Sequence, residues 1–161
     1  MKTKMKRPVS IKSMLVLVVA LAVVSGLAFA AGREPVSGSG WADLNLLTGA
    51  AVGHAQLTVG DTTLSAEVFV QLTGQVPGDD GSLHATATHT FVFDNGSITT
   101  TDRGVIDTDG TLNEHLTIVS GAGGFEGATG ELAVHGQVQF PAPGEPPIAH
   151  VFYDIRGVIS R

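Results

Sequence analysis

Apolar and polar residues alternate with period two along most of the chain after residue 30. The alternating segments are rich in Val, Thr, Ile and Phe, and Gly or Asp-Gly separates them. This pattern is typical of half-buried β-strands, and no stripe with the 3.6-residue helical period reaches helical length. The pattern predicts strands over residues 36–47, 51–60, 62–73, 82–94, 97–107, 111–120, 129–140 and 148–159.

Strands of this number, joined mostly by short turns, favour an eight-stranded antiparallel β-barrel, because closure removes exposed sheet edges. We therefore expect an all-β chain with a single barrel domain over residues 36–161. Residues 31–35 are expected to be a short linker that leads into this domain.

The turn at Asn95-Gly96 sets the expected register of the central hairpin. Asn-Gly is a strong signal for a type I′ turn, because both central residues of that turn have positive φ. With these two residues as the loop, His89 pairs directly with Asp102 across the hairpin.

The next turn, Thr108-Asp109-Gly110, sets the register of the following pair of strands. A three-residue loop with Gly110 in the left-handed conformation keeps the apolar faces together, whereas a two-residue loop would separate them. The three-residue loop places Gly104 opposite Glu114.

These registers divide the central strands into an apolar inner face and a Thr-rich outer face, as expected for a barrel with a water-facing exterior. An outer-membrane barrel would have the reverse pattern with aromatic girdles, and the chain has one Trp and one Tyr. The predicted interior comprises Leu83, Ala85, Ala87, Phe91, Phe93, Ile98, Ile106, Leu112, Leu116 and Ile118.

Three ionisable residues share the apolar inner face, namely His89, Asp102 and Glu114. A His–carboxylate pair in an apolar environment shifts pKa values and supplies either a general base or a polar anchor for a ligand. A buried pair with a purely structural role has the same sequence pattern. We therefore take these three residues as candidate ligand-binding residues, with Phe91, Phe93 and Phe125 as an apolar lining, and leave catalytic residues unassigned.

The first thirty residues differ from the rest of the chain. Five basic residues precede and flank an apolar run from Met14 to Val24, and Ala28-Phe29-Ala30 has the small-residue spacing of a cleavage site. These features predict a secretory signal peptide over residues 1–30, and hence a secreted or periplasmic protein. An uncleaved membrane anchor is the alternative, because the apolar stretch approaches spanning length.

Removal of the leader would change the charge of the protein. The remaining chain holds four arginines and no lysine against all 15 acidic residues, a formal charge of −11. Such a surface disfavours binding to nucleic acid or to anionic membranes. With no lysine or cysteine, the mature chain also lacks the residues needed for Schiff-base or thiol chemistry.

The stretch GAGGFEGATG, residues 121–130, raises the question of a phosphate-binding loop. A dinucleotide fingerprint requires a following helix and a P-loop requires a following Lys, but here an alternating strand follows. We expect instead a close-packed structural corner in which Phe125 closes one end of the barrel. The corner glycines are Gly121, Gly123, Gly124, Gly127 and Gly130.

This stretch, with LTIV before it and ELAVHG after it, resembles the G-T-G-x-F-x-G-A-x-G signature of allene oxide cyclase and dirigent-type barrels, especially bacterial secreted members of that superfamily. A segment similar to TTTDR, residues 99–103, also occurs there. The match covers roughly residues 88–159. Ala122 replaces the usual Thr, and the chain lacks the cysteine of the plant cyclase active site. The resemblance therefore implies the barrel, often dimeric or trimeric, and leaves cyclase activity unsupported.

The sequence predicts no metal site and no cofactor anywhere in the chain. His84, His115 and His135 could align on the outer face with Glu131, but no H-x-x-x-H or H-E-x-x-H spacing occurs. The sequence thus leaves three functions open: a barrel that binds a small hydrophobic ligand, a cyclase, isomerase or dirigent-like protein that uses the same pocket, and a structural barrel filled by its own side chains. The oligomeric state also stays open.

Overall fold

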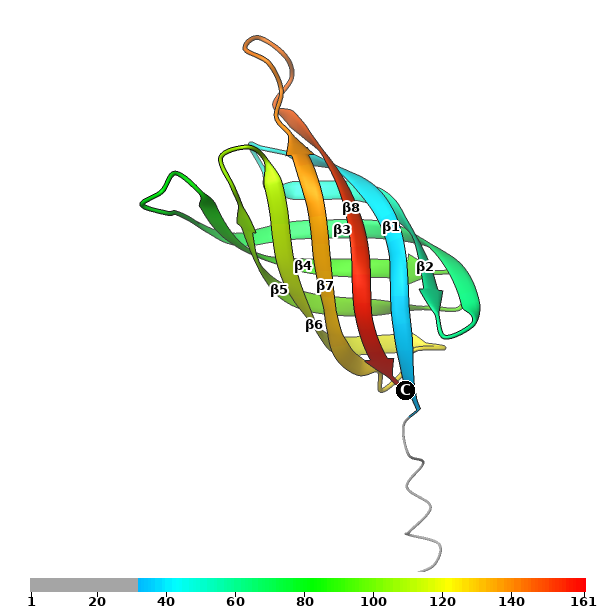
Figure 1. Ribbon diagram of the computed structural model, residues 1–161. Coiled ribbons are helices and arrows are strands. Elements are labelled where there is room, and N and C mark those ends of the chain that lie inside the picture. Colours follow the sequence, from blue (N-terminus) through cyan, green and yellow to red (C-terminus); the bar gives the residue numbers. More distant parts are fainter. Residues whose placement is uncertain (1–31) are drawn as a thin grey trace, which may run out of the picture. The chain divides into compact units, whose positions relative to one another are not determined.

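The computed structural model describes residues 32–161, and the predicted signal peptide lies outside them. Residues 33–161 form eight antiparallel strands that close into a barrel in chain order (Figure 1). The strands are β1 (Arg33–Asn45), β2 (Ala50–Val59), β3 (Thr62–Pro77), β4 (Leu83–Phe93), β5 (Gly96–Ile106), β6 (Thr111–Gly123), β7 (Thr129–Gln139) and β8 (Ile148–Ser160). The predicted all-β barrel is thereby confirmed.

The barrel closes where β1 pairs with β8, along a ladder that runs from Arg33 opposite Ser160 to Asn45 opposite Ile148. β1 therefore begins inside the segment that was expected to be a linker, because the backbone of Arg33, Glu34 and Pro35 pairs with the end of β8. All eight strands thus have two hydrogen-bonded neighbours, and the described sheet has no free edge.

The register at the first predicted turn is wrong by two residues. The loop residues are Asp94 and Asn95, and Gly96 pairs with Phe93. The only positive φ values in the described chain belong to glycines, so Asn95 does not adopt the type I′ conformation. Gly96 lies in the ladder because β6 passes close to it, and a Cβ on Gly96 would collide with the backbone of Ala122.

The second predicted turn is confirmed. Gly110 has a φ of 86°, its N–H donates to the Asp107 carbonyl oxygen, and Gly104 pairs with Glu114. A shift of two residues at the first turn leaves every side chain on its expected face, since the side-chain period is two. The predicted inner and outer faces are therefore correct.

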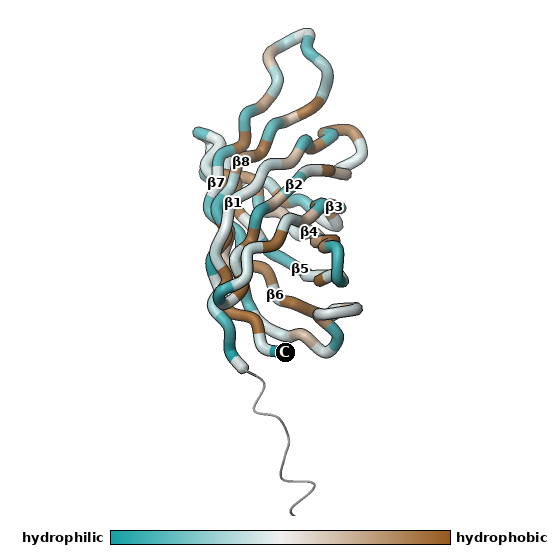
Figure 2. The backbone as a smooth tube through the Cα atoms, turned by 90° about the vertical axis from the view of Figure 1, so that its right-hand side faces the viewer, coloured by the Kyte–Doolittle hydropathy of each residue, from teal (hydrophilic) through white to brown (hydrophobic). Residues whose placement is uncertain are grey.

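The interior of the barrel is a single apolar core that receives side chains from all eight strands. Apolar and polar positions alternate along the tube in Figure 2, as this arrangement requires. Among its largest fully buried side chains are Phe91, Leu116, Phe125, Ile155 and Ile159.

The glycine corner lies at the end of the barrel where β6 connects to β7. Phe125 lies in the β6–β7 turn, is fully buried, and packs on Phe93 with ring centroids 4.8 Å apart. The Arg161 guanidinium covers its ring at 5.3 Å from the centroid. Gly123, Gly127 and Gly130 have positive φ, and the Gly124 N–H donates to the Asn95 carbonyl oxygen. A Cβ on Gly121 would overlap the Phe125 carbonyl.

Candidate functional site

Three neighbouring strands place ionisable side chains at one level of the barrel interior. His89 of β4 lies diagonally across from Asp102 of β5, because the ladder pairs His89 with Thr100 and Asp102 with Ala87. The contact is nevertheless made: Nδ1 of His89 lies 2.5 Å from Oδ2 of Asp102. Nε2 of His89 lies 3.9 Å from Oε2 of Glu114 on β6. The sequence thus identified the partners correctly but predicted a direct pair instead of a diagonal one.

The three side chains are almost completely removed from water. Their exposed fractions are 12% for His89, 1% for Asp102 and 11% for Glu114. The four arginines of the described chain lie outside the core. Among residues 32–161, two carboxyl groups therefore share the interior with one imidazole and no permanent cation, which is an unfavourable arrangement in a low-dielectric medium.

Burial and mutual interaction shift the pKa values of this cluster. Burial is the main cause that raises the pKa of Glu114 to about 7; the charge of His89 opposes the rise and that of Asp102 adds to it. Burial lowers the pKa of His89, but the hydrogen bond to Asp102 and the charges of both carboxylates outweigh it, so the pKa is raised overall. Near neutral pH the cluster can therefore gain or lose a proton readily.

Two further polar side chains lie in the same interior. Tyr153 projects inward from β8, and burial raises the pKa of its phenol, with the charge of Glu114 contributing. Its hydroxyl, Oγ1 of Thr100 and Oδ1 of Asp102 are buried and have no hydrogen-bond partner among the described residues. Buried polar atoms normally have hydrogen-bond partners, so these three atoms call for an explanation.

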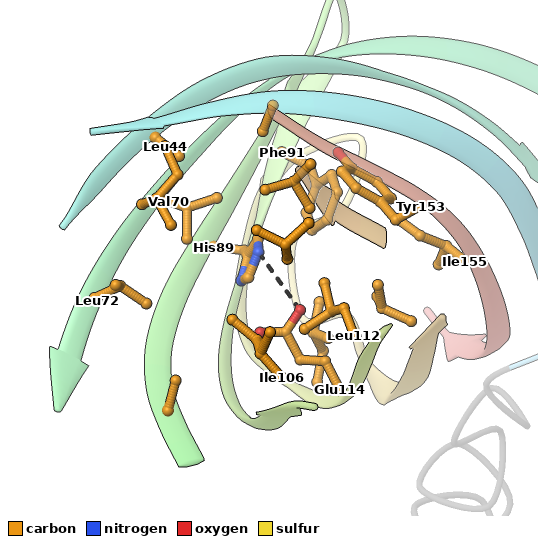
Figure 3. A pocket seen from close by; sticks show the side chains of 17 residues that line it. Leu44, Val70, Leu72, His89, Phe91, Ile106, Leu112, Glu114, Tyr153 and Ile155 are labelled. Atoms are coloured by element: carbon orange, nitrogen blue, oxygen red, sulfur yellow. Dashed lines mark ion pairs between the residues drawn. The ribbon is translucent and has the colours of Figure 1, made fainter. Parts of the chain in front are cut away.

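A cavity of about 70 Å³ lies beside the cluster (Figure 3). His89, Glu114 and Tyr153 are its polar lining residues. Side chains from all eight strands provide the apolar remainder: Ala42, Leu44, Ala51, Val70, Leu72, Ala85, Phe91, Ile106, Leu112, Leu116, Val134, Val138, Val151 and Ile155. The cavity lies toward the end of the barrel that bears the β1–β2, β3–β4, β5–β6 and β7–β8 connections, opposite the end closed by Phe125.

Of the three phenylalanines predicted to line the cavity, only Phe91 does so. Phe91 lines the cavity, with its ring stacked near His89 at a centroid separation of 6.0 Å. Phe93 and Phe125 instead pack together at the closed end and do not line the cavity. Asp102 lies behind His89 and contacts the cavity only through that ring.

Tyr153 is the residue that the sequence argument missed. The signal was present, because Tyr153 alternates with Val151 and Ile155 on the inner face of the last strand. A tyrosine among inward-facing aliphatic residues keeps a polar hydroxyl inside the barrel, where it needs a partner.

Two of the outer histidines have separate polar partners. His115 lies 3.6 Å from Glu131, and His135 contacts Asn113 at 2.8 Å. Within residues 32–161, the one group of side chains whose ligand atoms could hold a metal ion together is His89, Asp102 and Glu114, with all three atoms within 4.8 Å of one another.

Comparison with known proteins adds no family assignment: no family model matches the chain, and neither a curated protein nor a solved structure matches it. In the part of the chain that the structure describes, no helix has the length and apolar character needed to cross a membrane.

Proposed function

We propose that this protein is an exported barrel that binds a small, mainly apolar molecule in its interior and holds one polar group of that molecule with Glu114, His89 and Tyr153. The observation that carries this proposal is the cavity itself, which side chains leave unfilled beside the Tyr153 hydroxyl, a buried polar group that has no partner in the described chain. A barrel with a purely structural role has no need for either feature, since both reduce stability.

The size of the cavity limits the ligand. An apolar cavity of about 150 Å³ holds benzene, and pockets for drug-sized molecules measure about 300–1,000 Å³. At about 70 Å³, the interior accommodates only a few heavy atoms. The ligand is therefore either very small, or a longer molecule that places one end inside the barrel while the rest extends past the loops.

The surroundings of the loop-bearing end favour an apolar ligand. Leu46, Leu47, Val76 and Phe140 lie at this end of the barrel and are exposed, Leu47 to 81%. Exposed apolar side chains at the end of the barrel nearest the cavity are available to contact an apolar molecule. They would receive the part of a longer ligand that the cavity cannot hold.

An enzyme is the second candidate, and one geometric feature favours it. Asp102 accepts the Nδ1–H of His89 and so directs the other ring nitrogen toward Glu114 and the cavity. This arrangement orients His89 as a general base. Because burial raises its pKa to about 7, Glu114 can serve as a proton donor near neutral pH. A cyclase, an isomerase or a dirigent-like protein of the barrel superfamily that the glycine corner resembles would fit this chemistry.

Native mass spectrometry of the protein, purified gently from its own extracellular or periplasmic fraction, tests the proposal. We expect the protein mass to match a chain that starts at residue 31, with an additional mass from a bound organic molecule. The fraction of the protein that carries this molecule should be lower for Glu114→Gln. The matched control is Asp43→Asn, which changes the exposed pair of His150 and Asp43 at 2.6 Å. A clean protein mass from repeated preparations, with no small apolar molecule bound on addition, would favour the structural barrel.

A further inference from the structure

The interior cluster carries an unbalanced charge. Asp102 and Glu114 are buried with His89, and even a protonated imidazole offsets only one carboxylate. No arginine lies among the cavity-lining side chains. Buried charges are usually paired or coordinate a metal ion, so the cluster can reach neutrality either by taking up two protons or by binding a divalent cation.

The hydrogen bond between His89 and Asp102 prepares the histidine as a metal ligand. When Nδ1–H donates to Oδ2 of Asp102 at 2.5 Å, Nε2 has its lone pair free. Metal-binding histidines characteristically donate their other N–H to a carboxylate in this way, which fixes the tautomer and raises the basicity of the ring.

The spacing on the far side of the ring suits one ion. Nε2 of His89 and Oε2 of Glu114 are 3.9 Å apart. Transition-metal bonds to nitrogen and carboxylate oxygen measure about 2.0–2.2 Å, so an ion that bridges the two atoms spans up to about 4.2 Å. No backbone movement is needed for both atoms to reach the same ion.

The surroundings of His89 and Glu114 provide room for further ligands of the ion and contain a further carboxylate oxygen. The cavity adjoins His89 and Glu114, so additional coordination positions would face it and could take water or a polar group of a ligand. Oδ1 of Asp102, in a residue that is 5% exposed, is buried without a partner in the described chain and adds negative charge behind the ring.

From these observations we propose that the inner end of the cavity is a site for one divalent first-row transition-metal ion, with His89 Nε2 and Glu114 as direct ligands and Asp102 as the residue that positions His89. The mixed imidazole and carboxylate donors suit Zn²⁺, Co²⁺, Ni²⁺ or Cu²⁺. Ca²⁺ is disfavoured because it takes six to eight oxygen ligands. This site does not depend on the proposed organic ligand.

Titration of the untagged protein, stripped with a chelator, tests the site. Calorimetry with Zn²⁺ and the visible absorption of added Co²⁺ should both show one equivalent bound. We expect Glu114→Gln and His89→Gln to weaken this binding by more than about 100-fold, and Asp102→Asn to weaken it by about 10–100-fold through loss of the carboxylate behind the histidine. Circular dichroism of each variant reports whether the barrel is folded.

The control is the exposed pair of His150 and Asp43, which has the same chemistry and a similar distance of 2.6 Å. His150→Gln should leave the affinity for the bound equivalent within about threefold. The proposal is wrong if the wild-type protein binds no equivalent of either ion, or if Glu114→Gln retains full affinity while His150→Gln loses it. In the first case protons alone neutralise the cluster.

Discussion

Leu116→Ala tests whether the barrel interior contains an unfilled apolar space. Leu116 is fully buried on β6 and lines the cavity, so truncation would join the void left by its side chain to the existing space of about 70 Å³. The combined space would approach the size of about 150 Å³ that admits benzene. The variant should therefore lose stability and gain a new ligand.

The expected loss can be worked out from two contributions. Three carbons lose their apolar surroundings at about 0.8 kcal/mol each, or about 2.4 kcal/mol together. The void adds about 24 cal/mol per Å³, so a leucine-sized void contributes a further 1–2 kcal/mol, for a total of about 4 kcal/mol. Urea unfolding monitored by circular dichroism measures this loss as a lower midpoint with an unchanged m-value.

Benzene binding distinguishes this variant from an ordinary core truncation. Leu57 is 2% exposed but does not line the cavity, so Leu57→Ala should lose a similar stability without acquiring a benzene-sized space. We expect saturating benzene to raise the melting temperature of Leu116→Ala and to leave that of Leu57→Ala unchanged. Two results together would contradict the expected volume: a loss of less than about 1.5 kcal/mol in the free energy of unfolding of Leu116→Ala, and no rise of its melting temperature with benzene. They would mean that the neighbouring side chains had collapsed into the cavity.

Three further substitutions test other parts of the structure by urea unfolding. Phe125→Ala should cost about 3–5 kcal/mol, because it removes the fully buried ring at the closed end; a loss below 1 kcal/mol would show that the ring closes nothing. Gly121→Ala should destabilise the barrel more than Gly127→Ala, because a Cβ at Gly121 would overlap the Phe125 carbonyl oxygen. A Cβ at Gly127 would meet no atom within 4 Å, so the cost there comes only from its φ of 74°. The reverse order of stability losses would contradict the close-packed corner. Asp43→Asn should cost less than about 1 kcal/mol, since its pair with His150 is exposed; a larger loss would mean that this surface is buried in an assembly.

Period-two alternation and turn residues were sufficient to predict the eight strands. The hairpin register was not predictable in the same way, because a shift of two residues leaves the faces unchanged and so leaves no trace in the hydrophobic pattern. What decides the register is a contact with another strand: Gly96 must lie where β6 approaches, and that proximity is visible only in three dimensions.

The candidate site, like the fold, could be predicted from the sequence only in part. His89, Asp102 and Glu114 could be predicted because polar residues on an apolar face stand out from the alternation. Phe93 and Phe125 were assigned to the lining because alternation gives the face of a residue but not its level along the barrel axis, which depends on strand tilt and stagger. Tyr153 could have been found by applying the alternation argument to the last strand.

A crystal structure of the protein under xenon pressure tests the central claim most directly, because xenon enters apolar cavities without requiring a known ligand. We predict a xenon site in the space bounded by Phe91, Leu116 and Tyr153, beside the cluster of His89 and Glu114. An interior with no xenon, in which these side chains fill the space themselves, would contradict the binding function and leave a structural barrel.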